Sequence, residues 1–364
     1  MQYQYKVQQY LSVRKEKIVP IPDNCIIDER FLNGVTNIEF IDAFRLLQET
    51  FMKIYDDAIN DPVSWGYPLE NAESIDGCGP TGVRYDRIQD AFYFLFKEGY
   101  INDKVLYVNI KNYKDKTKKH TRTGLILKTL CGFGFAISGF DKGATEYTLS
   151  FPADMNVIDA LDSYVKAVDE MLLPLKKEYR LGPRMDYMGC LFYRFVEDRR
   201  EQKYDLIFHI LTDQVSAEYR EMCIALYDYA IAEGKRYHSY YNWCYHSIGF
   251  NDWFGLNYNF VTKEVYTNID FYKLLESDSI DLLYSLPEKL QKGFENPARI
   301  CRHCGGVAAV AHGNIPTDYN KCRQRFVYDW HGEEKENCTH QFRFNNLRKD
   351  DLRYIIDIYK AENN

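Results

Sequence analysis

Apolar residues recur at helical spacing along residues 36–59, and the stripe that they form is broad. Positions three and four apart lie on one face of an α-helix, so this pattern predicts an amphipathic helix. The stripe consists of Ile38, Phe40, Ile41, Phe44, Leu46, Leu47, Phe51 and Ile54. Pro, Gly and Asn interrupt residues 60–82, which predicts a long loop. We expect a second helix at about residues 85–98, ended by Gly99.

Between residues 104 and 152 the pattern changes to short strands around one polar segment. The Asp-Lys-Gly sequence that ends at Gly143 is typical of a hairpin turn between two of these strands. The expected elements are, in order, a strand (104–110), a polar and basic turn (111–124), a short helix (125–132) and two strands (133–140 and 146–152).

A long amphipathic helix is expected next, over residues 153–175. The charged segment 176–186 follows, and Gly182 and Pro183 interrupt it, which predicts a domain boundary. Beyond the boundary, Ser216 is a candidate N-cap for a further helix that Gly234 ends.

The last third of the chain returns to strands and then to helices. Residues 237–269 are strand-like and aromatic, residues 271–294 are helical, and a hairpin is expected around Gly332 before a final helix. Strands and helices do not alternate regularly, so the sequence predicts an α+β protein. We expect two mixed helix and antiparallel-sheet domains, 1–180 and 184–300, followed by a C-terminal module, 301–364.

Charge and composition limit the classes of function. A net charge of −7 over 364 residues argues against a dedicated nucleic-acid-binding protein, because neutralising phosphates takes a basic surface. The sequence shows no signal peptide and no apolar run near the roughly 18 residues of a membrane span. We therefore expect a cytoplasmic protein with no membrane partner. Its ten cysteines are then reduced, and serve as metal ligands or buried side chains instead of disulfides.

Four of these cysteines predict a structural zinc site in the C-terminal module. Two form a CxxC pair, and two flank the expected hairpin, whose sequence midpoint is Trp330. Because residues equidistant from a hairpin turn face each other, we expect the second two to meet across its open end. Four thiolates fill the coordination of Zn²⁺ and leave no open position for catalysis. The predicted ligands are Cys301, Cys304, Cys322 and Cys338.

Other interpretations of these cysteines stay open. His340 lies two residues beyond Cys338 and can replace it as a ligand. The cysteines can also be buried free thiols or, for the CxxC pair, a redox couple. A redox pair normally opens a helix in a thioredoxin-like setting, and the two glycines after Cys304 disfavour a helix start there.

Residues 327–362, "VYDWHGEEKENCTHQFRFNNLRKDDLRYIIDIYKAE", resemble the ending of a group of uncharacterised Firmicutes proteins. The tails of that group carry several cysteines, a Tyr-Asp hairpin with a Gly-containing turn, another cysteine, a short aromatic strand and a final helix. The resemblance covers about the last fifth of the chain. It implies that Cys322 and Cys338 take the two later cysteine positions and Cys301 and Cys304 the earlier ones. It implies a cysteine module and no particular activity.

The segment 237–260 is unusually rich in Tyr, Trp and Phe and contains two histidines. Aromatic residues fill sheet cores, but Tyr and Trp also line concave pockets, because they combine apolar area with a hydrogen-bonding group. Period two along strands would place Tyr241, Trp243 and Tyr245 on one face. The candidate ligand-binding residues are Tyr241, Trp243, Tyr245, His246, Trp253 and Tyr258.

The basic segment 111–124 is the second candidate site. A short helix preceded by basic residues and followed by a hairpin resembles a winged helix-turn-helix over residues 111–151, with helix 122–131 in the major groove. A strand directly before the segment leaves the helix pair incomplete, and the helix has few side chains that read base edges. A solvated loop is therefore favoured. The candidate nucleic-acid contacts are Lys114, Lys116, Lys118, Lys119 and Arg122.

The sequence thus favours a non-catalytic protein that binds a small molecule or a protein partner through its aromatic segment and holds a structural zinc ion. Nucleic acid is a less favoured partner, and the alternative function is a DNA-binding regulator that uses residues 111–151. An enzyme acting in an aromatic pocket of residues 237–260 comes third, because spacing alone places no acid–base pair or nucleophile.

Overall fold

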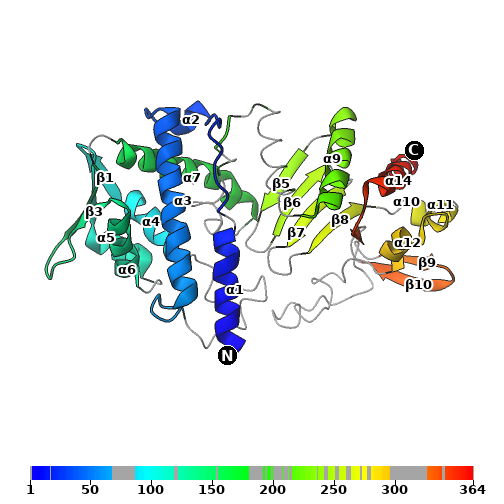
Figure 1. The fold of residues 1–364 in the computed structure, drawn as a ribbon, viewed down its shortest axis with the longest axis horizontal. Helices are drawn as coiled ribbons and strands as arrows, with labels where there is room; N and C mark the ends of the chain where they lie inside the picture. Colours follow the sequence, from blue (N-terminus) through cyan, green and yellow to red (C-terminus); the bar gives the residue numbers. More distant parts are fainter. Residues whose placement is uncertain are drawn as a thin grey trace. The chain divides into compact units, whose positions relative to one another are not determined.

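The structure is a computed structural model of the chain, which divides into two compact units, Met1–Leu206 and Ile207–Asn364 (Figure 1). Both units combine helices with antiparallel sheets, which confirms the predicted α+β class. The described residues are 2–16, 18–67, 87–118, 122–152, 155–179, 192, 195–197, 199, 208, 212, 215–235, 237–241, 245–250, 254–259, 264–270, 273–276, 280–295, 326–337 and 341–363.

Long helices form one part of the first unit. The predicted helix 36–59 is α3 (Asn37–Asn60), and it packs between α1 (Gln2–Glu16) and α7 (Val157–Tyr179). The short α2 (Glu29–Leu32) also contacts α7. Most of the apolar stripe of α3 is buried, but Ile38 is 71% exposed, because the buried face begins at Phe40.

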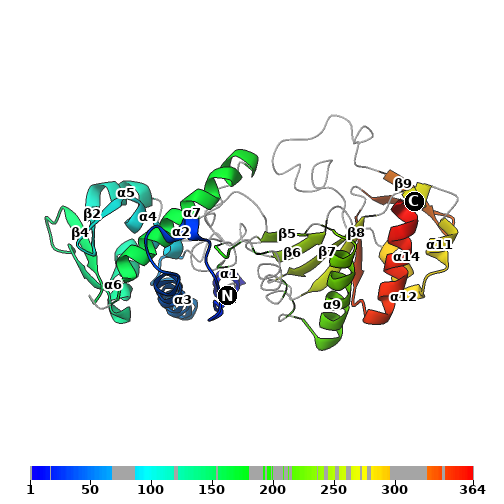
Figure 2. The same cartoon turned by 90° about the horizontal axis from the view of Figure 1, so that it is seen from above.

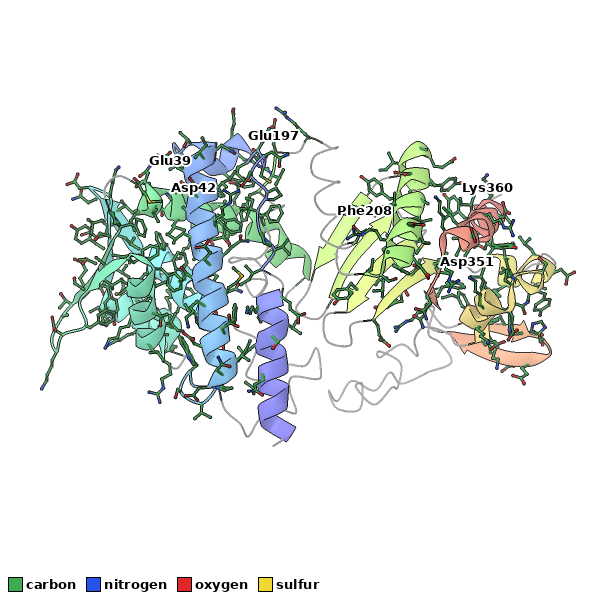
Figure 3. All side chains as sticks on the ribbon, in the orientation of Figure 1. Glu39, Asp42, Glu197, Phe208, Asp351 and Lys360 are labelled. Carbon is green, nitrogen blue, oxygen red and sulfur yellow. The ribbon has the colours of Figure 1, made fainter. Side chains whose placement is uncertain are left out.

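A capping box defines where α3 begins. Thr36 donates its backbone N–H and its hydroxyl to Glu39 Oε2 at 2.7 and 2.8 Å, and its hydroxyl oxygen accepts from the Glu39 N–H (Figure 3 labels Glu39). The hydrogen bonds from Thr36 lower the pKa of the Glu39 carboxyl. These hydrogen bonds satisfy the backbone N–H groups of Thr36 and Glu39 at the start of α3. The sequence pattern predicted this start to within one residue.

The sheet of the first unit has four antiparallel strands in the order β1-β2-β4-β3. Its inner face is buried and includes Leu106, Val108, Tyr147 and Leu149, and helix α4 (Arg87–Lys97) contacts β1 and β2. The strands are β1 (Gly99–Asn102), β2 (Val105–Asn109), β3 (Ala136–Ser138) and β4 (Glu146–Ser150).

Residues near 195 belong to the first unit, whereas the sequence assigned them to the second domain, 184–300. Val196 forms an antiparallel bridge with Ile27. The Phe195 ring lies 5.8 Å from Phe31 and 5.9 Å from Phe40, measured between ring centroids. A charged segment with Gly and Pro therefore does not mark the end of this unit, because aromatic packing continues beyond it.

The second unit contains a five-stranded antiparallel sheet in the order β11-β8-β7-β6-β5. Helix α9 (Ala217–Ala232) begins at the predicted N-cap Ser216, and its buried Tyr219 hydroxyl hydrogen-bonds Thr267 Oγ1 of β8 at 2.7 Å. The strands are β5 (Tyr237–Tyr241), β6 (Tyr245–Phe250), β7 (Phe254–Asn259), β8 (Val265–Asp270) and β11 (Gln341–Asn345).

The C-terminal residues share this sheet and a core with the rest of the second unit. Strand β11 pairs with β8, and the Phe294 ring contacts Trp330, Phe342 and Phe344. The predicted module 301–364 is thus joined to residues before it through the sheet. The remaining elements are α10 (Lys273–Glu276), α11 (Ile280–Tyr284), α12 (Glu288–Glu295), β9 (Phe326–Trp330), β10 (Glu333–Asn337), a 3₁₀ turn η6 (Lys349–Asp351) and α14 (Leu352–Asn363).

Candidate nucleic-acid interface

Residues 110–117 form a helix, α5 (Ile110–Thr117), where the sequence predicted a basic turn. Ile110, Tyr113 and Thr117 are buried, and their spacing of three and four residues places them on one face. Asn109 caps the helix, because its side-chain oxygen accepts from the Asn112 N–H at 3.1 Å. The prediction of a turn over 111–124 was therefore wrong for most of this segment.

Tyr113 fixes α5 against its neighbours. Its hydroxyl donates to the Ala91 carbonyl of α4 at 3.1 Å, and its ring meets Tyr147 of β4 edge to face at 5.8 Å. Burial raises the pKa of Tyr113, with a smaller contribution from Tyr147, so the hydroxyl stays protonated and keeps donating. Helix α5 thus joins α4 and the sheet through a buried tyrosine.

A second short helix, α6 (Thr123–Leu130), follows α5 and continues into a 3₁₀ turn, η2 (Cys131–Phe133). Its buried side chains are Ile126, Leu127 and Leu130, and α4 contacts both α5 and α6. Helix α4, strands β1 and β2, helices α5 and α6, and the β3–β4 hairpin follow one another in the chain. Figure 2 labels α4, β2, α5, α6 and β4 of this segment. Within the sheet, β2, β4 and β3 are neighbours in that order.

With the extra edge strand β1 set aside, the element order and strand order resemble those of a winged helix-turn-helix, in which the second helix of the pair faces the major groove. Residues 87–151 are called the winged helix below. The sequence analysis found the helix pair incomplete, and α5 supplies its first helix. The strand before the basic segment is the first strand of the winged sheet, so it is no objection to this fold.

The exposed lysines of α5 gather beside its buried face. Lys111, Lys114 and Lys118 are exposed and follow one another at spacings of three and four residues, and they are called the lysine face below. Among the described residues, no carboxylate pairs with these three ammonium groups. Lys116 is also exposed, and it lies 3.5 Å from a Glu98 carboxylate oxygen. Lys119 lies outside the described residues.

Arg122 precedes α6 in an unusual backbone conformation. Its φ of 62° lies in the left-handed region, and its side chain is exposed and makes no capping hydrogen bond. Non-glycine residues enter this region at a cost of about 1–2 kcal/mol. The guanidinium therefore stands at the start of α6, on the same winged helix as the lysine face.

The positive charge is local to the winged helix. Residues 87–151 contain eleven Lys and Arg against six Asp and Glu, a net charge of +5 in a chain of net charge −7. The rest of the chain accordingly carries −12. The whole-chain charge, which argued against nucleic acid as a partner, hides a basic region that a phosphate backbone can neutralise.

The loop of the wing depends on two glycines in the left-handed region, Gly139 and Gly143, both with φ of 93°. A Cβ on Gly139 would lie 2.2 Å from the Glu146 carbonyl oxygen, whereas a Cβ on Gly143 would meet nothing within 4 Å. We expect Gly143→Ala to lower the free energy of unfolding by about 1–2 kcal/mol through backbone strain. Gly139→Ala should cost about 1–3 kcal/mol more, through the steric clash. Chemical denaturation of the two variants compares them, and equal losses would contradict this geometry.

The predicted zinc ligands Cys301, Cys304, Cys322 and Cys338, and the rival His340, lie outside the described residues. The described part of the chain holds no group of three or more His, Cys, Asp or Glu able to bind a metal ion. The hairpin itself forms with the predicted glycine in its turn, since His331 and Gly332 have φ of 55° and 81°. Its register pairs Trp330 with Glu333, so its centre lies between His331 and Gly332.

This register corrects the expected hairpin centre at Trp330. Cys338 is six residues after Gly332, whereas Cys322 is nine residues before His331, so the two cysteines are not equidistant from the turn. The argument that placed them opposite each other therefore does not hold. The four-cysteine site depends on their spacing in the sequence alone.

The register brings together three of the six candidate ligand-binding residues of the second unit. Tyr241 of β5 pairs with His246 of β6, and His246 pairs with the buried Tyr258 of β7. Trp243 and Trp253 lie outside the described residues. Tyr245 precedes His246 on β6, whereas Tyr241 is the last residue of β5. Period two does not apply between Tyr241 and Tyr245, because they lie on different strands.

Comparison with family models, curated proteins and solved structures finds no match to this chain. None of the helices in the described part of the chain is long and apolar enough to cross a membrane. The candidate interface therefore depends on the geometry of the winged helix itself. Sequence reasoning found its lysines and its hairpin and missed the helix that presents the lysines.

Proposed function

We propose that the winged helix binds double-stranded DNA. Helix α5 is the observation that carries the proposal, because it supplies the first helix of the pair and presents Lys111, Lys114 and Lys118 together on one face. Ammonium groups on such a face can neutralise phosphates and release their counterions. The net charge of +5 on residues 87–151 supports the same partner.

The architecture favours a duplex over a single strand. A helix-turn-helix places its second helix in the major groove of B-form DNA, which is wide enough to admit it, while the first helix crosses the backbone. In this chain α6 is the second helix and α5 the first. The lysine face lies on the helix that would cross the backbone, where phosphates are the available contacts.

Titration of a labelled duplex of about 20 base pairs with the full chain tests the proposal. Phosphate contacts alone give dissociation constants of about 10⁻⁴–10⁻⁶ M at physiological salt, so we expect saturable binding in or below that range at about 0.1 M salt. Fluorescence anisotropy measures it directly. No change in anisotropy up to about 100 µM protein would contradict the proposed function.

We also propose a structural Zn²⁺ in the C-terminal region, held by Cys301, Cys304, Cys322 and Cys338. The CxxC spacing of the first pair supports it, because two thiolates separated by two intervening residues bind one Zn²⁺ in structural sites. His340 stays the alternative to Cys338 as the fourth ligand. The site would stabilise the second unit, since binding free energy at a structural site contributes to folding.

Cys301→Ser should remove the zinc and lower the melting temperature of the chain by about 5 °C or more. Metal analysis of protein purified without chelator should give about one equivalent of zinc for the wild type and none for the variant. Cys131→Ser is the control, because Cys131 is an exposed thiol of the first unit and should leave the zinc content unchanged. Metal-free wild-type protein that melts the same with and without chelator would contradict the site.

A further inference from the structure

The first turn of α6 offers little that can recognise a base pair. Side chains that read base edges in the major groove are mainly Arg, Lys, Asn, Gln, Asp and Glu, and none of these occurs from Thr123 to Leu127. Gly124 has no side chain, and a Cβ built on it would meet nothing within 4 Å. Leu125 is the exposed side chain of this turn, at 38%, and it has no hydrogen-bonding group. Within this turn only Thr123 has a hydrogen-bonding side chain, and the exposed Arg122 directly before it is the one cation at this end of the helix among the described residues.

The last turn of α6 adds two polar side chains, and both already have partners. The Lys128 ammonium lies 5.3 Å from the centroid of the Phe140 ring in the wing. The Thr129 hydroxyl donates to the Leu125 carbonyl at 3.0 Å. These contacts hold the two groups against the protein. Three cations without a carboxylate partner among the described residues, Lys111, Lys114 and Lys118, lie instead on α5 in the lysine face, and Arg122 is a fourth, directly before α6.

We infer that the winged helix holds DNA through its phosphates and does not discriminate between base sequences. This inference rests on the proposed function and specifies its substrate as duplex DNA of any sequence. Phosphate contacts position a protein on the duplex and carry no sequence information, whereas base-edge contacts specify the sequence. The lysine face lies on α5, the helix that would cross the phosphate backbone. Helix α6 has few side chains that can contact base edges. B-form DNA is the partner because the major groove of duplex RNA is too narrow for a helix.

The test compares the affinity of the full chain for several duplexes of equal length and unrelated sequence. A protein that reads bases loses about 1–3 kcal/mol for each mismatched pair, about 5-fold to 150-fold in affinity. We expect all the duplexes to bind within about threefold of one another. Several rounds of selection from a random-sequence pool should recover no common motif.

Two variants add an independent measurement. Lys128→Gln should change the affinity for all duplexes by the same factor, because Lys128 carries no base readout. Lys114→Gln should also weaken all of them equally, and by more, because Lys114 lies in the lysine face. A sequence-dependent change in the Lys128→Gln variant would show that α6 reads bases.

The outcomes separate the inference from the proposed function. A selected sequence bound more than about 30-fold tighter than a scrambled duplex of the same composition would overturn the inference and leave DNA binding intact. Absence of binding to every duplex would contradict the proposed function itself. Tighter binding to duplex RNA than to DNA would overturn the assignment of B-form DNA as the substrate.

Discussion

Replacing Lys111, Lys114 and Lys118 together by Glu is expected to weaken duplex DNA binding at least about 100-fold at about 0.1 M salt. The three ammonium groups lie on one face of α5, and among the described residues no carboxylate pairs with them. Reversing their charge replaces three attractive contacts with phosphate by three repulsive ones. Fluorescence anisotropy with the full chain measures the loss.

A charge-matched control separates the lysine face from the net charge of the chain. Lys292, Lys349 and Lys360 are exposed lysines of the second unit, and Glu at these positions changes the net charge by the same amount (Figure 3 labels Lys360). We expect this control to lose less than about threefold in affinity. Equal losses in both triple variants would mean that overall charge, and not α5, governs binding.

The largest effect on stability is expected from Tyr113→Ala. The side chain is almost fully buried, contacts Tyr147 with its ring and donates its hydroxyl to the Ala91 carbonyl, so it joins α5 to α4 and the sheet. Truncating a buried aromatic side chain costs about 3–5 kcal/mol. Chemical denaturation followed by tryptophan fluorescence and circular dichroism measures the change in the free energy of unfolding.

Two tyrosine variants calibrate this result. Tyr113→Phe removes only the hydrogen bond to Ala91 and should cost about 1 kcal/mol. Tyr100→Ala removes a ring that is 61% exposed and stacked on Tyr107 at 5.3 Å, so its cost should stay near 1 kcal/mol. If Tyr113→Ala costs no more than Tyr100→Ala, then Tyr113 does not anchor α5 as described.

The sequence pattern predicts the long helices and the β3–β4 hairpin, but it does not predict α5. Helix α3 has a wide apolar stripe over six turns, whereas α5 has only Ile110, Tyr113 and Thr117 on its buried face among lysines and other polar residues. Eight residues give a weak periodic signal, and three lysines within them suggest a solvated turn. The signal that was available is the spacing of those three buried residues, together with Asn109 as a capping residue.

The sequence pattern also does not predict contacts between residues that are far apart in the chain. The ring of Phe195 contacts the rings of Phe31 and Phe40, which are more than 150 residues earlier in the chain. No local sequence pattern predicts that contact. The same holds for β11, which pairs with β8 across a long separation in sequence. Local patterns predicted the strands and helices. They did not predict which elements contact each other, because contacts between distant residues form only in the folded chain.

The candidate sites differ in how far sequence reasoning reached. For the hairpin, Gly332 predicted the turn, but the register depends on which two residues form it, and a midpoint calculated from cysteine positions cannot supply that. For the aromatic segment, Tyr241 ends β5 and Tyr245 begins β6, so period two along one strand does not relate them. For the winged helix, the sequence showed the charged residues, but it did not show that three of the lysines share one face of α5.

The salt dependence of DNA binding tests the central claim most directly, because it counts the phosphates that the protein neutralises. Each neutralised phosphate of B-form DNA contributes about −0.9 to the slope of log K against log salt concentration. If the lysine face contacts the backbone, the full chain should show a slope of about −3 or steeper, and Lys114→Gln should reduce its magnitude by about 1. A slope near zero, or a slope that Lys114→Gln leaves unchanged, would contradict the assignment of α5 as the DNA-binding face.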